Sequence, residues 1–138
     1  PRDEPRAEPR DVRTAPARRI LVVDDNADLA SLIAELLQHL GHEVELAHDG
    51  PSALEVAARF QPEVALLDIG LPVMDGYELA RQLRQLGDAP IRLIAISGYG
   101  QDADRRRSEE AGFSGHLVKP VSPDLLAQVI DRGDFPDQ

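Results

Sequence analysis

The sequence predicts an α/β fold, a doubly wound parallel sheet of five strands with five flanking helices. Short apolar segments alternate with amphipathic helical segments from Ile20 onward. The short segments are apolar throughout rather than at every second residue, which is typical of parallel strands covered on both faces. The connections between segments are short, and right-handed crossovers then place helices on both sides of one sheet.

The first half of the chain predicts two strands and two helices. Residues 20–25 (ILVVDD) form the first predicted strand, and residues 27–41 predict a helix with leucines along one face and a glycine at its end. Residues 43–47 (EVELA) predict the second strand. The second helix is predicted over residues 51–60, because proline favours the first turn of a helix.

The second half predicts three strands and three helices. The strands are expected at residues 63–68, 91–97 and 115–119. The helices are expected at residues 77–87, 101–112 and 122–132. The helix over 101–112 (QDADRRRSEEAG) has little apolar surface, so its charges first indicate a solvated face. It is also a candidate partner surface, because a helix with few core contacts shifts easily.

The composition predicts one folded domain with short flanking segments. The chain has 138 residues, which suits one domain with its own core. Residues 1–17 contain four prolines, four arginines and four acidic residues, so we expect a disordered linker there. We expect the folded domain over 18–133 and a tail over 134–138. The chain begins at Pro1 without a methionine before Met74, and we expect it to be excised from a longer protein.

Charge and composition exclude several classes of protein. The net charge of −10 argues against a nucleic-acid surface. No apolar segment approaches the roughly 18 residues that a membrane helix needs, and no signal peptide opens the sequence. The absence of cysteine excludes disulfides and thiolate metal sites and fits a reducing compartment. We therefore expect a cytoplasmic, monomeric domain without direct membrane contact, whose parent protein is free to be membrane-anchored.

Polar residues gather where the predicted strands end. These residues are Asp24 and Asp25 after the first strand, Asp68 after the third, Ser97 after the fourth and Lys119 after the fifth. Sites in open parallel sheets form outside the carboxyl ends of the strands, where the strand order reverses. With the flavodoxin-like order 2-1-3-4-5, the first and third strands are neighbours, so these side chains meet at one edge.

Each of these residues alone also has an ordinary structural explanation. Asp25 can be the N-cap of a helix, and Ser97 can be a plain loop residue. The Asp-Gly pairs at 49–50 and 75–76 usually form turns. These explanations give no reason for the polar groups to share one edge of the sheet. Lys119 is also the only lysine beside fourteen arginines, which suits a position that needs a compact point charge.

The residue types at this edge favour phosphoryl chemistry on the protein itself. Three neighbouring carboxylates repel one another unless cations compensate, and Mg²⁺ prefers oxygen ligands of this kind. The sequence has no common glycine-rich phosphate loop, which argues against a bound nucleotide. A carboxylate can instead act as a nucleophile, with a metal ion, a lysine and a hydroxyl neutralising the transferred charge.

Four segments resemble the receiver domain of two-component response regulators, across residues 19 to about 131. They are VVDDN (22–26), LLDIGLPVMDG (66–76), AISGYG (95–100) and HLVKP (116–120). Their order and spacing together make the resemblance specific.

The resemblance implies a phosphoacceptor with a metal site. Asp68 would accept a phosphoryl group from a histidine kinase or a histidine phosphotransfer domain. Asp25 would bind Mg²⁺ directly, and Asp24 would bind it directly or through water. Asp68 and the backbone carbonyl of Gly70 would complete the protein ligands.

The resemblance also implies how the phosphoryl group is held and sensed. Ser97 would donate its hydroxyl to one phosphoryl oxygen, and Lys119 would pair with another. The Lys119–Pro120 peptide bond would be cis. The switch residue would be His116, where the family usually has Phe or Tyr, and a surface histidine without a switching role is the alternative.

Two positions that tune water access to the phosphate in receiver domains are occupied here by Gly70 and Tyr99. Glycine has no side chain to orient water, and tyrosine can shield the phosphate, so we expect slow self-dephosphorylation.

The resulting prediction is a receiver domain that catalyses only its own phosphorylation and dephosphorylation. The motifs, the linker and the lack of an output domain after residue 131 indicate the carboxyl-terminal receiver of a hybrid sensor histidine kinase. Three alternatives stay open: a stand-alone single-domain regulator, a magnesium-dependent phosphatase and a non-phosphorylated interaction module. The phosphatase would need a second acid two residues after Asp68 or a substrate cap, but Gly70 occupies that position and no insertion supplies a cap.

Overall fold

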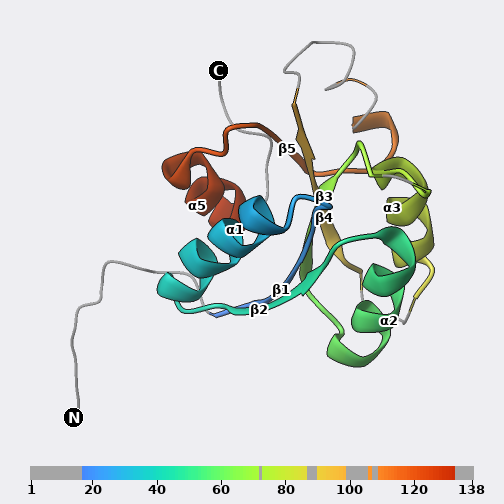
Figure 1. The fold of residues 1–138 in the computed structure, drawn as a ribbon, viewed down its shortest axis with the longest axis horizontal. Coiled ribbons are helices and arrows are strands. Elements are labelled where there is room, and N and C mark those ends of the chain that lie inside the picture. The colour runs from blue at the N-terminus through green and yellow to red at the C-terminus, as the bar shows by residue number, and fades with distance from the viewer. Residues whose placement is uncertain (1–16, 72, 87–89, 99–105, 107–108, 133–138) are drawn as a thin grey trace.

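The computed structural model describes residues 17–71, 73–86, 90–98, 106 and 109–132. Its strands are β1 (Arg19–Val23), β2 (Glu43–Ala47), β3 (Val64–Asp68), β4 (Arg92–Ser97) and β5 (Gly115–Val118). They form one sheet in the order β2-β1-β3-β4-β5, and all four pairings are parallel. The predicted strand order is therefore confirmed (Figure 1).

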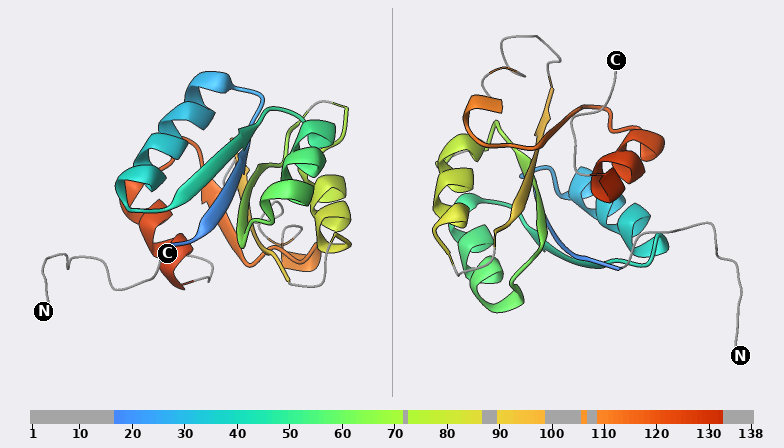
Figure 2. Two further views of the ribbon diagram at one scale, coloured as in Figure 1. Left: turned by 90° about the horizontal axis from the view of Figure 1, so that it is seen from below. Right: turned by 180° about the vertical axis from the view of Figure 1, so that it is seen from behind.

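Four helices lie in the described part of the chain. They are α1 (Ala27–His39), α2 (Gly50–Phe60), α3 (Gly76–Arg84) and α5 (Pro123–Arg132). Helices α1 and α5 cover one face of the sheet, and α2 and α3 cover the other (Figures 1 and 2). Most of the helix predicted over 101–112 lies outside the described residues, as do Tyr99, nearly all of the predicted linker and the predicted tail.

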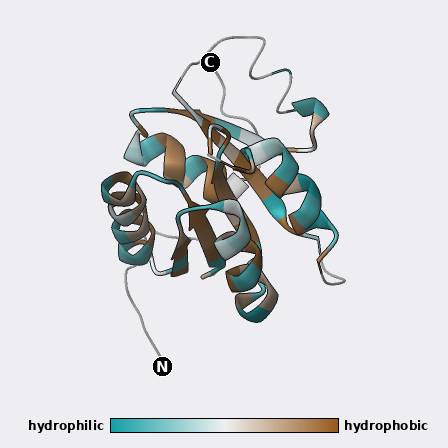
Figure 3. Cartoon of the chain, turned by 45° about the vertical axis from the view of Figure 1, so that its right-hand side comes forward, coloured by the Kyte–Doolittle hydropathy of each residue, from teal (hydrophilic) through white to brown (hydrophobic). Residues whose placement is uncertain are grey.

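Strands β1, β3 and β4 are buried on both faces, as their uninterrupted apolar sequences predict, whereas the edge strand β2 is partly exposed. Alternate residues of each strand point to opposite faces, so one strand contributes to two separate apolar clusters. In β3, Ala65 and Leu67 pack with α2 and α3, whereas Val64 and Leu66 pack with α1 and α5. The apolar colour therefore concentrates on the strands, while the helices also carry hydrophilic residues (Figure 3).

Three side chains cap the helices that follow β1, β2 and β3. Asn26 caps α1 by accepting a hydrogen bond from the backbone N–H of Leu29, so the N-cap explanation for Asp25 is wrong. Asp49 and Asp75 cap α2 and α3 in the same way. The two Asp-Gly pairs therefore start helices rather than isolated turns, and both helices begin one residue earlier than predicted.

Polar groups at the amino ends of the strands bond to the backbone. The Arg18 N–H donates to Nδ1 of buried His42 over 3.0 Å, which ties the chain before β1 to the chain before β2. The Arg92 guanidinium donates to the carbonyls of Val129 and Ile130 in the last turn of α5. A cation at this end of a helix also interacts favourably with the helix dipole.

None of the helices in the described ranges combines the length and the apolar character that crossing a membrane requires.

Candidate functional site

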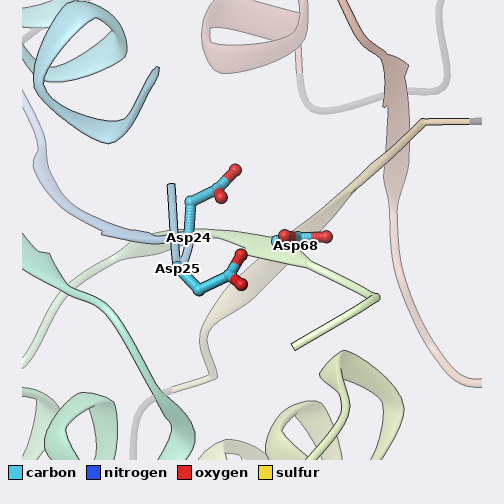
Figure 4. A group of neighbouring side chains, drawn as sticks. All are labelled: Asp24, Asp25 and Asp68. Atoms are coloured by element: carbon cyan, nitrogen blue, oxygen red, sulfur yellow. The ribbon is translucent and has the colours of Figure 1, made fainter. Parts of the chain in front are cut away.

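Three carboxylates meet where β1 and β3 end, at the switch point of the sheet. Asp24 and Asp25 follow β1 directly, and Asp68 is the last residue of β3. One oxygen from each side chain lies within 4.8 Å of the others, and Figure 4 shows the three side chains as neighbours. Asp24 and Asp68 are buried, whereas Asp25 is exposed to solvent. We call these three residues the carboxylate cluster.

Lys119 places its ammonium group between the two buried carboxylates. Its Nζ lies 3.2 Å from Oδ2 of Asp24 and 3.4 Å from Oδ2 of Asp68. Lys119 follows β5 by one residue rather than ending it, and the Lys119–Pro120 bond is cis, as the family resemblance implies. The lysine thereby connects the last strand of the sheet to the strands at its centre.

The pKa values of Lys119 and Asp24 are both raised, for different reasons. Burial alone would lower the pKa of Lys119, but attraction to Asp24 and Asp68 outweighs it and raises that pKa. Burial raises the pKa of Asp24 and repulsion by Asp68 adds to this, although Asn26 and Lys119 partly oppose it. The Lys119 ammonium therefore offsets part of the repulsion between the Asp24 and Asp68 carboxylates.

The turn after Asp68 holds the carboxylate from the backbone side. The Gly70 N–H donates to Oδ1 of Asp68 over 2.9 Å, so the two oxygens of this carboxylate have different partners. A side chain at Gly76 would bring its Cβ within 2.6 Å of the Ile69 Cα, so only glycine lets α3 start this close to the turn. Val73 in the same turn has a φ of 70° and is almost fully exposed.

Ser97 and His116 form a separate, buried pair at the ends of β4 and β5. Ser97 Oγ and His116 Nε2 lie 2.8 Å apart in a hydrogen bond. Both residues are buried, so the alternative of a surface histidine at position 116 is wrong. The structure therefore brings the hydroxyl of Ser97 and the imidazole of His116 together, which the sequence did not predict.

One further residue beside the cluster was not predicted from the sequence. No polar residue was named after the second strand, yet His48 follows β2 directly and its Nδ1 lies 3.0 Å from the backbone carbonyl of Asp24. The Asp24 N–H in turn donates to the carbonyl of Ala47 over 3.2 Å. The available signal was positional, because His48 follows its strand just as Asp24 follows β1.

The chemistry of the carboxylate cluster fits a hard divalent cation. Carboxylate oxygens are the ligands that Mg²⁺ prefers, and the site combines two buried carboxylates with one that faces solvent. Oδ2 of Asp24 and of Asp68 already face the ammonium of Lys119. A bound metal ion would therefore add to the charge neutralisation that Lys119 already provides.

Comparison with known sequences finds one family and two kinds of relative. The family model described as the response regulator receiver domain matches residues 20–131. The response regulator MprA of Mycobacterium ulcerans is 38% identical over 112 residues, covering 80% of this chain and 48% of that protein. The sensor histidine kinase RcsC of Escherichia coli is 35% identical over 111 residues, covering 80% of this chain and 12% of the kinase. The chain thus spans about half of the regulator's length and a small part of the kinase's.

Comparison of structures gives the same kind of neighbour. The receiver domain of the sensor histidine kinase PA1611 from Pseudomonas aeruginosa, with a magnesium ion coordinated in its active-site cleft, matches with a TM-score of 0.75 and 31% identity. The match covers 85% of this chain and 97% of that one. A CheY-like receiver domain from Methanospirillum hungatei gives a TM-score of 0.75 at 31% identity, covering 85% of this chain and 94% of the other.

Proposed function

This chain belongs to the response regulator receiver domains of two-component signalling, and we propose that its Asp68 accepts a phosphoryl group from a phosphohistidine donor with Mg²⁺ present. The observation that supports this most directly is the carboxylate cluster with the Lys119 ammonium against it. Packing of the fold does not need three carboxylates and one lysine at the switch point of the sheet, whereas a phosphoacceptor site uses all four.

The proposed reaction is a transfer between two protein side chains. An oxygen of the ionised Asp68 attacks the phosphorus, the bond from phosphorus to the donor's histidine nitrogen breaks, and its electron pair stays on that nitrogen. The Gly70 N–H already orients Oδ1 of Asp68, and the Lys119 ammonium lies near Oδ2. In the product, Lys119 and the Ser97 hydroxyl would hold the phosphoryl oxygens, which is the positioning that such transfers need.

Magnesium would be held by Asp25, Asp24, Asp68 and the Gly70 carbonyl. When bound, it supplies charge neutralisation for the oxygens that carry the transferred phosphoryl charge. The exposed carboxylate of Asp25 is the ligand that solvent reaches most easily, so we assign it the direct role. The magnesium-containing PA1611 receiver, at 31% identity, supports the choice of ion.

The proposed parent is a hybrid sensor histidine kinase, with this domain as its receiver. A full regulator and a sensor kinase match a similar share of this chain at similar identities, so both contexts have relatives. The donor is then a histidine kinase or phosphotransfer domain, and the domain acts on no outside substrate. Slow loss of the phosphoryl group is part of the proposal, because Gly70 presents no side chain to orient water near Asp68.

Acetyl phosphate tests the acceptor directly. The purified domain is incubated with acetyl phosphate and Mg²⁺, and its intact mass is followed beside an Asp68→Asn variant. We expect one added phosphoryl group that is absent in the variant, requires Mg²⁺ and is removed by hydroxylamine. No addition from acetyl phosphate or from a phosphorylated histidine kinase would contradict the proposal and favour an interaction module.

The slow-hydrolysis expectation has its own measurement. The half-life of the acyl phosphate is compared between the wild type and a Gly70→Asn, Tyr99→Glu double variant. We expect a shorter half-life in the variant, because both new side chains can orient or admit water. An unchanged half-life would contradict the expectation and leave the acceptor role of Asp68 untouched.

A further inference from the structure

The hydrogen bond between Ser97 and His116 is part of the folded interior. Its 2.8 Å length is typical of a good hydrogen bond, and the two residues are only 3% and 5% exposed. His116 pairs with Ala95 across β4 and β5, so strand alternation puts Ser97 and His116 on the same face of the sheet. Ala95 belongs to the apolar cluster beneath α2 and α3, and the pair extends this cluster toward the site.

The direction of this hydrogen bond matters because a serine hydroxyl has only one hydrogen. It can donate one hydrogen bond and accept others through its lone pairs. In the proposed function that hydrogen goes to a phosphoryl oxygen on Asp68, so it cannot also go to His116. The bond then persists only if Nε2 of His116 carries a hydrogen and donates it to Ser97 Oγ. A neutral imidazole has that hydrogen in one of its two tautomers.

We propose that His116 is a positioning residue that donates its Nε2 hydrogen to Ser97 Oγ and thereby directs the serine hydrogen toward the phosphoryl group. This inference rests on the proposed function, since it describes the phosphorylated domain. Two hydrogen bonds in series strengthen each other in a buried site. The imidazole therefore makes the Ser97 hydroxyl a better hydrogen-bond donor. A phenyl ring of similar shape cannot do so, because it has no N–H to donate.

The first experiment separates hydrogen bonding from packing. Phosphorylation by acetyl phosphate with Mg²⁺ is timed by intact mass for the wild type, His116→Phe and His116→Gln. Phenylalanine keeps an aromatic ring without a donor, and glutamine keeps an N–H that can donate. We expect about a tenfold slower reaction for His116→Phe, the effect of one hydrogen bond of about 1.4 kcal/mol, and about threefold or less for His116→Gln. Equal rates for the wild type and His116→Phe would overturn the inference.

A double-mutant cycle with Ser97 provides a readout that packing alone would not move. In a Ser97→Ala background the His116→Phe change should have no further effect on the rate, because its partner is already gone. A similar loss in both backgrounds would mean that the ring acts through packing, and the inference would be wrong. Thermal melts of each variant identify any that fail to fold, and for these the following spectroscopic result decides.

Nitrogen-15 spectra of the wild-type imidazole test the direction of the bond without any substitution. The His116 signals are recorded with acetyl phosphate and Mg²⁺ present, while intact mass reports the phosphorylated fraction. We expect a hydrogen on Nε2. Phosphorylated protein with a hydrogen on Nδ1 alone would overturn this inference and leave the proposed function standing. No phosphoryl uptake by the wild type would overturn both.

Discussion

The two ends of the parallel strands use polar groups in different ways. At the amino ends, the partners are backbone groups, as where His42 accepts from the Arg18 N–H and Arg92 donates to carbonyls of α5. At the carboxyl ends of β1 and β3, charged side chains face one another, and Lys119 lies against two buried carboxylates. The first arrangement stabilises the fold. The second keeps repelling groups together, which is typical of sites where stability is given up for function.

The largest effect is expected when Lys119 loses its charge at the carboxyl end. Lys119→Met leaves Asp24 and Asp68 facing each other, and we expect a loss of roughly 3 kcal/mol in the free energy of unfolding at pH 7, as for other broken buried pairs. Urea denaturation measures this loss. Arg59→Met is the matched control, because the Arg59–Glu45 pair is exposed and 4.0 Å long, and it should change stability by about 1 kcal/mol or less.

The same substitution has a pH dependence that sharpens the contrast. The raised pKa of Lys119 means that its stabilising effect is complete below the ordinary lysine pKa and is lost as the pH rises through the folded value. The wild type should therefore lose stability at alkaline pH more steeply than Lys119→Met does. Parallel alkaline curves for the two proteins would show that the lysine does not hold the cluster.

At the amino end, removing a polar partner should affect stability alone. His42→Ala deprives the half-buried Arg18 N–H of its acceptor, and we expect a loss of about 2 kcal/mol in unfolding free energy. His42→Asn is the control, because its side-chain oxygen can accept in place of Nδ1 and should restore much of the loss. Phosphorylation by acetyl phosphate should keep its wild-type rate in both variants. A large change in that rate would break the distinction between the two ends.

Neutralising a buried carboxylate at the other end should have the opposite effect on stability. Burial raises the pKa of Asp24, so its ionised form destabilises the fold, and this penalty grows as the pH rises from the ordinary aspartate pKa to the folded value and is complete above it. Asp24→Asn should therefore melt at a higher temperature than the wild type at pH 7. Its Mg²⁺ affinity, measured by titration calorimetry, should fall at least tenfold, or about 1.4 kcal/mol. If Asp24→Asn were less stable than the wild type at pH 7, the ionised Asp24 would not lower stability, contrary to this prediction.

The smallest expected effect concerns the strained turn beside the site. Val73 is β-branched and has a φ of 70°. Its side chain is almost fully exposed, so a substitution there removes little packing. Val73→Gly should stabilise the domain by about 1 kcal/mol, since the left-handed conformation costs about that much for a residue with a Cβ. Gln61→Gly, at a φ of 52° far from the cluster, is the comparison and should gain less because glutamine is unbranched. A destabilised Val73→Gly would show that the side chain has a role of its own.

The sequence predicted the strands and the meeting of their polar ends, because uninterrupted apolar segments indicate strands covered on both faces and the carboxyl ends of parallel strands share one edge. Apolar segments such as 64–67 can be placed only in a covered sheet, and Asp24, Asp68 and Lys119 then share its carboxyl side. Helix starts were less predictable, because Asp25 and Asn26 are adjacent and both residue types favour the N-cap position that Asn26 occupies. The bond between Ser97 and His116 depends on side-chain rotamers between β4 and β5, which no pattern in a single sequence specifies.

Lys119 is the only lysine in the chain, which makes the site chemically addressable. Reductive methylation with carbon-13 formaldehyde keeps the positive charge and would label a single ε-amine, beside two buried carboxylates. The resulting dimethyl-lysine gives its own magnetic-resonance signal, and its chemical shift would follow ions and phosphoryl groups as they arrive. The same uniqueness means that an acylating metabolite or a lysine acetyltransferase meets only one lysine target here, and that modification would remove the charge that holds the carboxylates together.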